Sequence, residues 1–291
     1  MAEIGTAQNE EASLRRYLAA DHYYGIAKWL YFGGLSLTVA LALISPLVLL
    51  FWADAGPALG AIAGAWLFVS RLLLERLKRE HQLKGATAQE MFDCGVFKLD
   101  WNETLVRRLS EEEIRGASGL MSNADRVRNW YPTSEAMPWP RSVLVCQRAN
   151  AVWARRQHRA YSRVLMIGAG AWAIVGVVVA VADGASLATY LVTIALPSLP
   201  ALLDATEFAR AHSTNAEKRQ LVEDKVDGLL KNGDGTSQDL REIQDQLFNL
   251  RRDAPLVPGW FYKLIRARFE EDMRYAARRT AEGGSTNKEG K

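Results

Sequence analysis

The side chains that could perform acid–base chemistry are few and poorly grouped. Asp93 and Asp100 are seven residues apart, a spacing that would place both carboxylates on one face of a helix. A turn within the intervening segment 95–99 would separate them. The sequence also lacks a phosphate-binding glycine loop after a strand and the GxSxG, HExxH and CxxC motifs. We therefore predict no catalytic residues and no enzymatic activity.

Metal-binding residue types are equally dispersed. Four histidines lie far apart, each near a basic segment: His22, His81, His158 and His212. Such placement is typical of solvated or interfacial histidines rather than of metal ligands. The two cysteines, Cys94 and Cys146, have no second pair at metal-ligand spacing. The sequence thus predicts no metal site and no cofactor.

The elements that would carry any site are dominated by four long stretches without charge. They are residues 29–53, 55–70, 164–182 and 184–203, with 25, 16, 19 and 20 residues; the second continues after Arg71 as three leucines. A helix needs about 20 apolar residues to cross the hydrocarbon core of a bilayer. Arg71 would lie at the end of its span and extend its head group to the interface. The pattern predicts an all-α membrane protein with four transmembrane helices arranged as two hairpins.

The basic residues around these stretches predict their orientation. The links near Asp54 and Asp183 contain no lysine or arginine, whereas the other four span ends carry sixteen between them. Because lysine and arginine are retained on the cytoplasmic side, both termini are predicted to be cytoplasmic. The predicted regions are a cytoplasmic amino-terminal helix (1–27), hairpin 1 (28–74), a cytoplasmic middle segment (75–162), hairpin 2 (163–204) and cytoplasmic carboxyl-terminal helices with a disordered tail (205–291).

The cytoplasmic segments are predicted to be mostly helical. Phe92-Asp93-Cys94 is interpreted as part of an ordered loop, and Ser110 with Glu113 forms a capping-box pattern. The carboxyl-terminal part is predicted to contain three amphipathic helices. Their apolar residues are Leu221, Val222, Val226, Leu229 and Leu230; Leu240, Ile243, Leu247, Phe248 and Leu250; and Phe261, Leu264, Ile265, Phe269 and Met273. Thr236 and Asp239 would begin the second.

A few residues within the spans could allow movement. Pro197 and Pro200 remove helical hydrogen bonds and favour a bend, while Gly168 and Gly176 permit close helix contact. Together with Arg71 they are the candidates for a gate. Ordinary packing in a small helical bundle explains the same residues equally well.

Several separated motifs resemble a known family. In chain order they are Tyr24 with Ala27-Lys28, Phe92-Asp93-Cys94, Asp100-Trp101-Asn102, Asn129-Trp130-Tyr131-Pro132, Cys146-Gln147-Arg148-Ala149-Asn150 with Trp153, Ile243-Gln244-Asp245, Arg251, and Val257-Pro258-Gly259-Trp260-Phe261-Tyr262. Their order around four spans is similar to that of the SMODS-associated four-transmembrane effectors of bacterial anti-phage defence. The resemblance covers roughly residues 8–276 and departs at Asp100, where a proline is expected before the tryptophan.

This resemblance implies a function that the residues alone do not show. It implies a multi-pass protein of the bacterial inner membrane, acting beside a cyclic-oligonucleotide synthase. The second messenger would make the effector oligomerise or open a pore, which permeabilises the membrane and stops the infected cell. The implied partners are the lipid bilayer, a cyclic oligonucleotide and further copies of the chain, but no DNA or RNA polymer.

An anionic nucleotide would be held by guanidinium groups and aromatic rings. The candidate ligand residues are Arg148, Asn150, Trp153, Arg155, Trp130 and Tyr131. An arginine close to a span, such as Arg155, is also explained as a topology determinant or a lipid contact. Trp101, Trp130 and Trp260 are expected to be core anchors rather than stacking surfaces.

Two other functional classes remain open from the sequence. A membrane-anchored scaffold could recruit a partner protein without forming a pore. A membrane-bound enzyme would require Asp93, Asp100 and His158 to meet in the fold.

Overall fold

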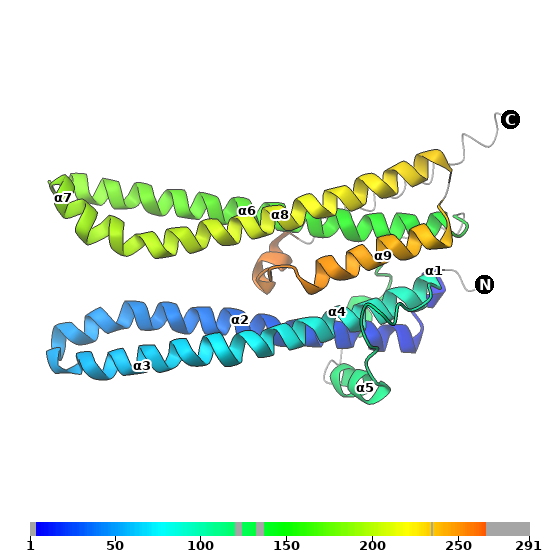
Figure 1. Ribbon diagram of the computed structural model, residues 1–291, viewed down its shortest axis with the longest axis horizontal. Coiled ribbons are helices and arrows are strands. Elements are labelled where there is room, and N and C mark those ends of the chain that lie inside the picture. The colour runs from blue at the N-terminus through cyan, green and yellow to red at the C-terminus, as the bar shows by residue number, and fades with distance from the viewer. Residues whose placement is uncertain (1–3, 120–123, 132–136, 234, 266–291) are drawn as a thin grey trace.

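The structure is a computed structural model that describes residues 4–119, 124–131, 137–233 and 235–265, and within these ranges the chain is all α-helical. Two long helical hairpins lie side by side and project in the same direction, as Figure 1 shows. Shorter helices pack around the opposite half of the molecule, where both hairpins begin and end. The predicted all-α class is confirmed.

The first hairpin consists of two antiparallel rods. The first rod is α2 (Glu11–Phe51), whose 41 residues give a length of about 61 Å. After the turn η1 (Ala53–Ala55), the returning rod comprises α3 (Gly56–Val69), the π-helical turn η2 (Ser70–Leu74) and α4 (Glu75–Phe97). The chain therefore runs as one helix from Glu11 through the first apolar stretch.

The second hairpin repeats this arrangement. Its first rod is α6 (Arg141–Ala182), and its returning rod comprises α7 (Leu187–Tyr190), the π-helical turn η4 (Leu191–Ala195) and α8 (Leu196–Asn232). The two rods meet along most of their length. Each hairpin thus has one π-helical turn in its returning rod, a feature that often marks functional positions in helices.

The remaining elements lie in the half where the hairpins begin. They are α1 (Ile4–Ala7), α5 (Glu111–Gly119), η3 (Ala124–Val127), α9 (Ser237–Arg252) and a short helical stretch at 259–265. The predicted capping box at Ser110 and the predicted helix start at Thr236 are both present, the second also as a capping box. At the start of α5, the backbone N–H groups of Ser110 and Glu113 each donate to the side chain of the other residue. Thr236 and Asp239 do the same at the start of α9.

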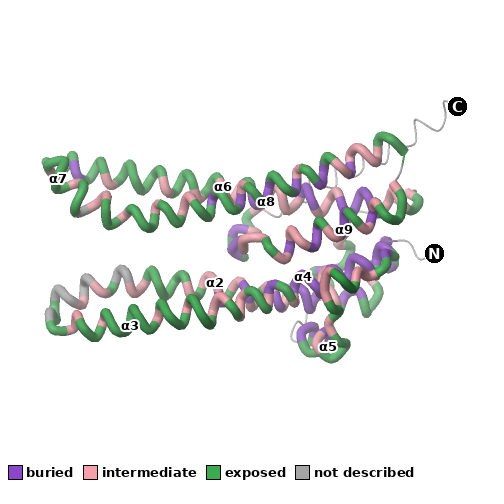
Figure 2. Tube along the Cα trace, viewed as in Figure 1, coloured by how far each residue is buried: buried purple, intermediate pink, exposed green. Residues whose placement is uncertain are grey.

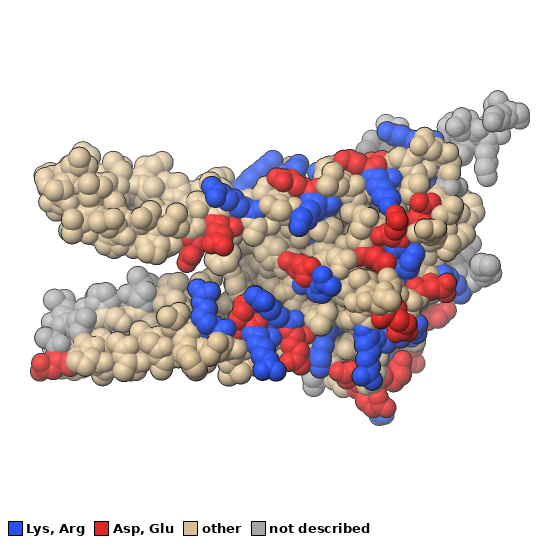
Figure 3. All heavy atoms as spheres, in the orientation of Figure 1, with Lys and Arg blue, Asp and Glu red and all other residues tan. Residues whose placement is uncertain are grey.

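The two halves of the molecule along its long axis differ in how many residues are buried (Figure 2). Buried residues concentrate around α4 and α9, whereas the projecting arms expose large apolar side chains such as Phe68, Val178 and Leu203. The same arms are almost free of charged residues on the face shown in Figure 3, and the charges gather on the other half. By length and composition, two rods in the described part of the chain, 56–97 and 141–182, are suited to cross a membrane. The most apolar windows of these rods are 0% and 6% buried, so they are not packed inside a core of this chain.

Three local predictions are wrong in detail. Phe92-Asp93-Cys94 lies inside α4, which continues to Phe97 and ends where Lys98 adopts a left-handed conformation with φ of 58°. Leu221 to Leu230 form the end of α8 rather than a separate helix, since no proline or glycine lies between Pro200 and Leu221. In the third helix Phe261 is buried but Leu264 is exposed, so they do not share one buried face. Phe269 and Met273 lie outside the described residues.

The gating candidates lie in the arms. Arg71 is part of η2, Pro197 lies in the first turn of α8 directly after η4, and Pro200 is inside α8. A β-carbon on Gly176 would be 3.0 Å from Ile194, so this glycine does permit close contact between the rods. Gly168 has no such neighbour within 4 Å. Their role in gating stays a prediction.

Gly85 provides a test of how α2 packs against α4. A β-carbon there would lie 3.0–3.1 Å from three ring carbons of Tyr24, closer than ordinary van der Waals contact. We expect Gly85→Ala to lower the free energy of unfolding in detergent by about 1–3 kcal/mol, because the ring must move out of a packed site. Gly228→Ala is the control: nothing lies within 4 Å of its β-carbon position, and a helical alanine should stabilise by about 0.5–1 kcal/mol. Equal effects of the two changes would contradict this packing.

Candidate functional site

A buried polar cluster lies where both hairpins meet α9. We use this name for Glu90 and Asp93 of α4, Tyr131, Gln147 of α6, and Arg241, Gln244 and Arg251 of α9. The side chains of Glu90, Asp93, Gln147 and Gln244 are at most 1% exposed. Polar groups so deeply buried are costly unless they are paired, so their partners determine how the elements fit together.

Asp93 is the centre of this cluster. The Arg251 guanidinium lies 2.6 Å from its carboxylate, and the Gln244 amide donates to it at 2.9 Å. The Tyr131 hydroxyl also donates to Asp93. Burial raises the pKa of Tyr131 well above its usual range, and the adjacent Asp93 carboxylate raises that pKa further. Burial alone would lower the pKa of Arg251, but Asp93, Tyr131 and Glu90 reverse this effect and keep the guanidinium charged.

Glu90 lies one turn before Asp93 and has a similar set of partners. Arg241 contacts it at 2.5 Å, Gln244 donates to it at 2.8 Å, and Arg251 lies 3.7 Å away. Burial raises the pKa of Glu90, although Arg251 and Arg241 oppose this shift. Gln244 therefore bonds to both Glu90 and Asp93, while Gln147 of α6 donates to the Leu240 carbonyl and to Gln244 at 2.8 and 3.2 Å.

The carboxyl-terminal end of α9 is also held from both sides. Gln82 of α4 donates to the carbonyls of Arg252 and Ala254 at 3.0 and 2.7 Å. Asn215 and Arg219 of α8 donate to the Leu250 carbonyl at 3.4 and 3.3 Å. Burial and Arg251 lower the pKa of Arg219 to about 9, and its charge faces the end of a helix dipole that favours cations. Hairpin 1 and hairpin 2 are therefore joined through α9.

The predicted ligand arginines lie on a different surface, between α6 and α8. Arg148 contacts Asp227 at 2.5 Å and Glu223 at 3.2 Å, and Arg155 contacts the other oxygen of Glu223 at 2.8 Å. The Asp227 hydrogen bond raises the pKa of Arg148, so it stays cationic. The structure brings these two arginines together, but it pairs both with carboxylates of the same hairpin.

The other four predicted ligand residues lie elsewhere. Asn150 donates at 2.8 Å to the hydroxyl of Tyr131, which is itself a member of the buried polar cluster. Trp130 packs on Tyr17 with ring centres 4.5 Å apart, and Trp153 meets Tyr262 edge-on at 5.9 Å. None of the six residues lines either of two surface hollows of 460 and 510 Å³, which lie beside α5 and between α8 and α9. The six residues therefore do not form one pocket in this conformation.

The core-anchor expectation is confirmed for Trp101 and Trp130, which pack against the core. It is wrong for Trp260, whose side chain is 63% exposed.

Sequence reasoning missed a histidine pair. His158 of α6 and His212 of α8 are 5% and 2% exposed, and their Nδ1 atoms are 2.8 Å apart. Of the two settings predicted for these histidines, solvated or interfacial, the solvated one is wrong for this pair. The hairpin brings together side chains that are 54 residues apart in sequence. Asp93 pairs with Arg251 and His158 pairs with His212, so the described contacts do not bring Asp93, Asp100 and His158 together as a triad. Among the described residues no group of three possible metal ligands is present.

Arg251 tests the buried polar cluster. Arg251→Met removes a guanidinium that contacts the buried carboxylates of Glu90 and Asp93. This loss should lower the free energy of unfolding by about 3–5 kcal/mol. Arg252→Met is the matched control, because Arg252 forms an exposed pair with Asp253. Its loss should cost about 0–1 kcal/mol. Chemical unfolding in detergent measures both, and a similar small effect at the two positions would refute the cluster's importance.

The histidine pair predicts how stability depends on pH. Burial lowers the pKa of His212 to about 4, and burial with Arg219 and His212 nearby lowers that of His158. Both groups are neutral in the folded chain while the unfolded chain binds protons below pH 6.5, so stability should fall as pH drops from about 6.5 towards 4. His212→Gln removes one of the two titrating groups. The slope of the free energy of unfolding against pH should therefore decrease by about 1.4 kcal/mol per pH unit in this range. An unchanged slope in that variant would contradict the assignment.

Comparison with known proteins agrees with the resemblance seen in the sequence. Residues 2–280 match the family model described as the SMODS-associating 4TM effector domain. A protein of Bacillus cereus (strain VD146), named "Probable CBASS effector molecule", is 24% identical over 278 residues, which cover 91% of this chain and 94% of the relative. No solved structure matches. Because the family model spans nearly the whole sequence, the chain belongs to the SMODS-associating 4TM effector family.

Proposed function

We propose that this chain is a membrane effector of CBASS anti-phage defence that opens a multi-subunit pore when a cyclic oligonucleotide binds. The family match and the name of the Bacillus cereus relative support the defence role. The single observation that carries the membrane role is the exposure of large apolar side chains on both projecting hairpins. The expected absence of catalysis is part of this proposal.

In this proposal all four arms cross the bilayer. Trp29 of α2 and Trp52 directly after that helix are 74% and 71% exposed and mark the two ends of the first apolar stretch. Their separation of 23 residues corresponds to about 35 Å of helix, which fits a hydrocarbon core of about 30 Å with tryptophans at both interfaces. The charged half of the molecule, with both ends of each hairpin, would lie in the cytoplasm beneath the bacterial inner membrane.

A pore requires more than one copy of the chain. Four arms arranged as two separate hairpins do not enclose a wide water path. The hairpins contact each other near their base, where Tyr31 and Phe208 have ring centres 6.1 Å apart. Gly168 presents an open surface on α6, which suits close contact with a helix of another copy.

The ligand would act through the surface between α6 and α8. A phosphodiester bound by Arg148 must compete with Asp227 and Glu223, so binding would exchange ion pairs within hairpin 2 for contacts to the ligand. The π-helical turns η2 and η4 and the adjacent Pro197 are positions where the returning rods can change their bend.

Dye release from proteoliposomes tests the proposal. We expect release with at least one of a panel of cyclic di- and trinucleotides, at concentrations on the order of nanomolar to micromolar. Arg148→Ala should weaken the response at least tenfold in ligand concentration. Arg210→Ala is the control, because Arg210 is a basic residue of α8 outside the predicted ligand set.

A scaffold without a pore is the rival function. Inserted, folded protein that releases no dye with any nucleotide would support the scaffold and contradict the pore. Release that is identical in wild type and Arg148→Ala would retain the pore and reject this ligand site.

A further inference from the structure

The short helical stretch at 259–265 has two different faces. On one side, Val257 just before it and Phe261 within it are 5% and 3% exposed. On the other side, Trp260 and Leu264 are 63% and 73% exposed, and Lys263 between them is also exposed. Trp260 and Leu264 are four residues apart and therefore form one apolar strip on the helix surface.

The buried face of this stretch joins the two hairpins. Phe261 packs on Tyr161 of α6 with ring centres 5.0 Å apart, and Tyr262 meets Trp153 of the same helix. The Tyr262 ring also lies 6.0 Å from the Lys28 ammonium group of α2. In Figure 1 the stretch, drawn in orange, lies between the hairpins at the middle of their length. Its exposed strip is thus fixed in place rather than carried on a loose end.

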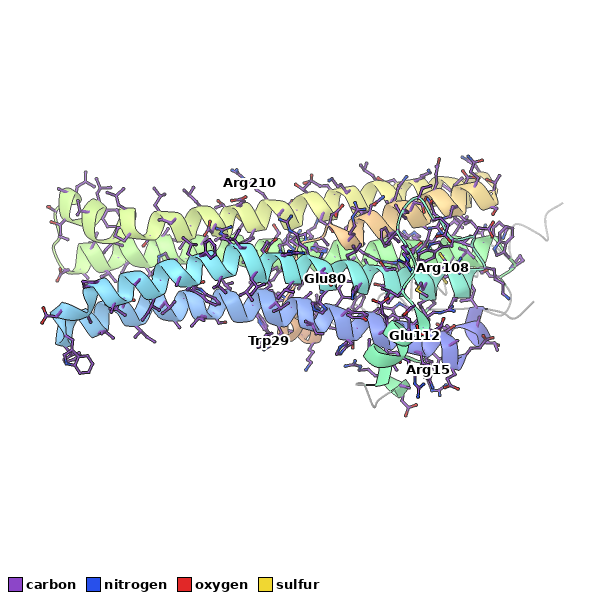
Figure 4. All side chains as sticks on the ribbon, turned by 60° about the horizontal axis from the view of Figure 1, so that its bottom comes forward. Arg15, Trp29, Glu80, Arg108, Glu112 and Arg210 are labelled. Atoms are coloured by element: carbon purple, nitrogen blue, oxygen red, sulfur yellow. The ribbon has the colours of Figure 1, made fainter. Side chains whose placement is uncertain are left out.

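This position coincides with the border between the apolar arms and the charged half. Lys28 is the last charged residue before the first apolar stretch, and exposed Trp29 follows it. In Figure 4 the labelled Trp29 lies beside the same orange stretch, in agreement with the contact between Lys28 and Tyr262. Trp260 and Leu264 therefore lie near the level at which α2 would enter the bilayer.

We propose that residues 259–265 form a membrane-interface helix whose exposed strip of Trp260 and Leu264 inserts between lipid head groups. This inference rests on the four-span arrangement of the proposed function. A tryptophan suits the interface because its ring is apolar and its N–H can still bond to head groups. The exposed Lys263 ammonium complements the phosphates of the lipids, while its stem covers apolar surface.

The insertion would give the stretch a mechanical role. Its buried face contacts both hairpins and its exposed face contacts lipid, so it fills the gap between the hairpins at the cytoplasmic surface of the bilayer. Any change in hairpin separation would then alter its contacts with the membrane.

Site-specific fluorescence in nanodiscs of phosphatidylethanolamine and phosphatidylglycerol tests the inference on the full chain. An environment-sensitive dye is attached at Leu264→Cys, at Phe68→Cys in the second arm and at Glu112→Cys in α5. Cys94 and Cys146 are buried, and the unsubstituted chain gives the background of labelling. Lipids with a spin label on the acyl chain close to the head group quench a dye that is in the interface.

We expect the dye at 264 to be quenched several-fold more than the dye at 112 and to emit at shorter wavelength. Trp260→Ser in the Leu264→Cys chain should reduce that quenching, because half of the inserted strip is lost. If the dye at 68 is quenched but the dye at 264 emits as it does in water, the interface helix is overturned. The four-span arrangement is then retained. Water-like emission at 68 would instead overturn the four-span arrangement on which the inference rests.

Discussion

The removal of Glu90 and Asp93 from water is the constraint on which the rest of the charged half depends. Two carboxylates one turn apart on α4 cannot be buried unless cations and amide donors reach them from other elements. Arg241, Gln244 and Arg251 supply these groups, and all three belong to α9. Because α9 is also bonded to Gln147 of α6 and to Asn215 and Arg219 of α8, compensating the two acids brings hairpin 1 and hairpin 2 together.

The projecting arms form the other half of the molecule, and their exposed surface is apolar rather than charged. Its arms expose apolar side chains and keep their backbone hydrogen bonds within helices, which is how a chain satisfies its polar groups in lipid. Among the side chains that the structure describes, the arms of the two hairpins share no contact comparable to the buried polar cluster, whereas α9 and the stretch at 259–265 join the hairpins at the base. A ligand that shifts the helices at the base could therefore change the separation of the arms. This coupling would be the physical link between the predicted messenger and the predicted pore.

The sequence predicted the features that depend on composition and local order. Uncharged runs predicted the rods, and the pairs Ser110–Glu113 and Thr236–Asp239 predicted two helix starts. It could not predict partners that are distant in the chain: His158 and His212 meet across 54 residues, and Glu90 meets Arg241 across 151. The expected ligand residues share this difficulty, because a guanidinium looks the same in sequence whether it binds a phosphate or, like Arg148, a neighbouring carboxylate.

The most direct test of the central claim is the distance between the hairpin ends, measured by pulsed electron resonance between spin labels at Phe51→Cys and Val181→Cys in nanodiscs. If α9 joins the hairpins through Asp93 and Arg251, the distance distribution should be narrow in the otherwise unchanged chain and in Arg252→Met. It should broaden in Arg251→Met while the helix content is retained. Identical distributions in Arg251→Met and Arg252→Met would contradict the claim.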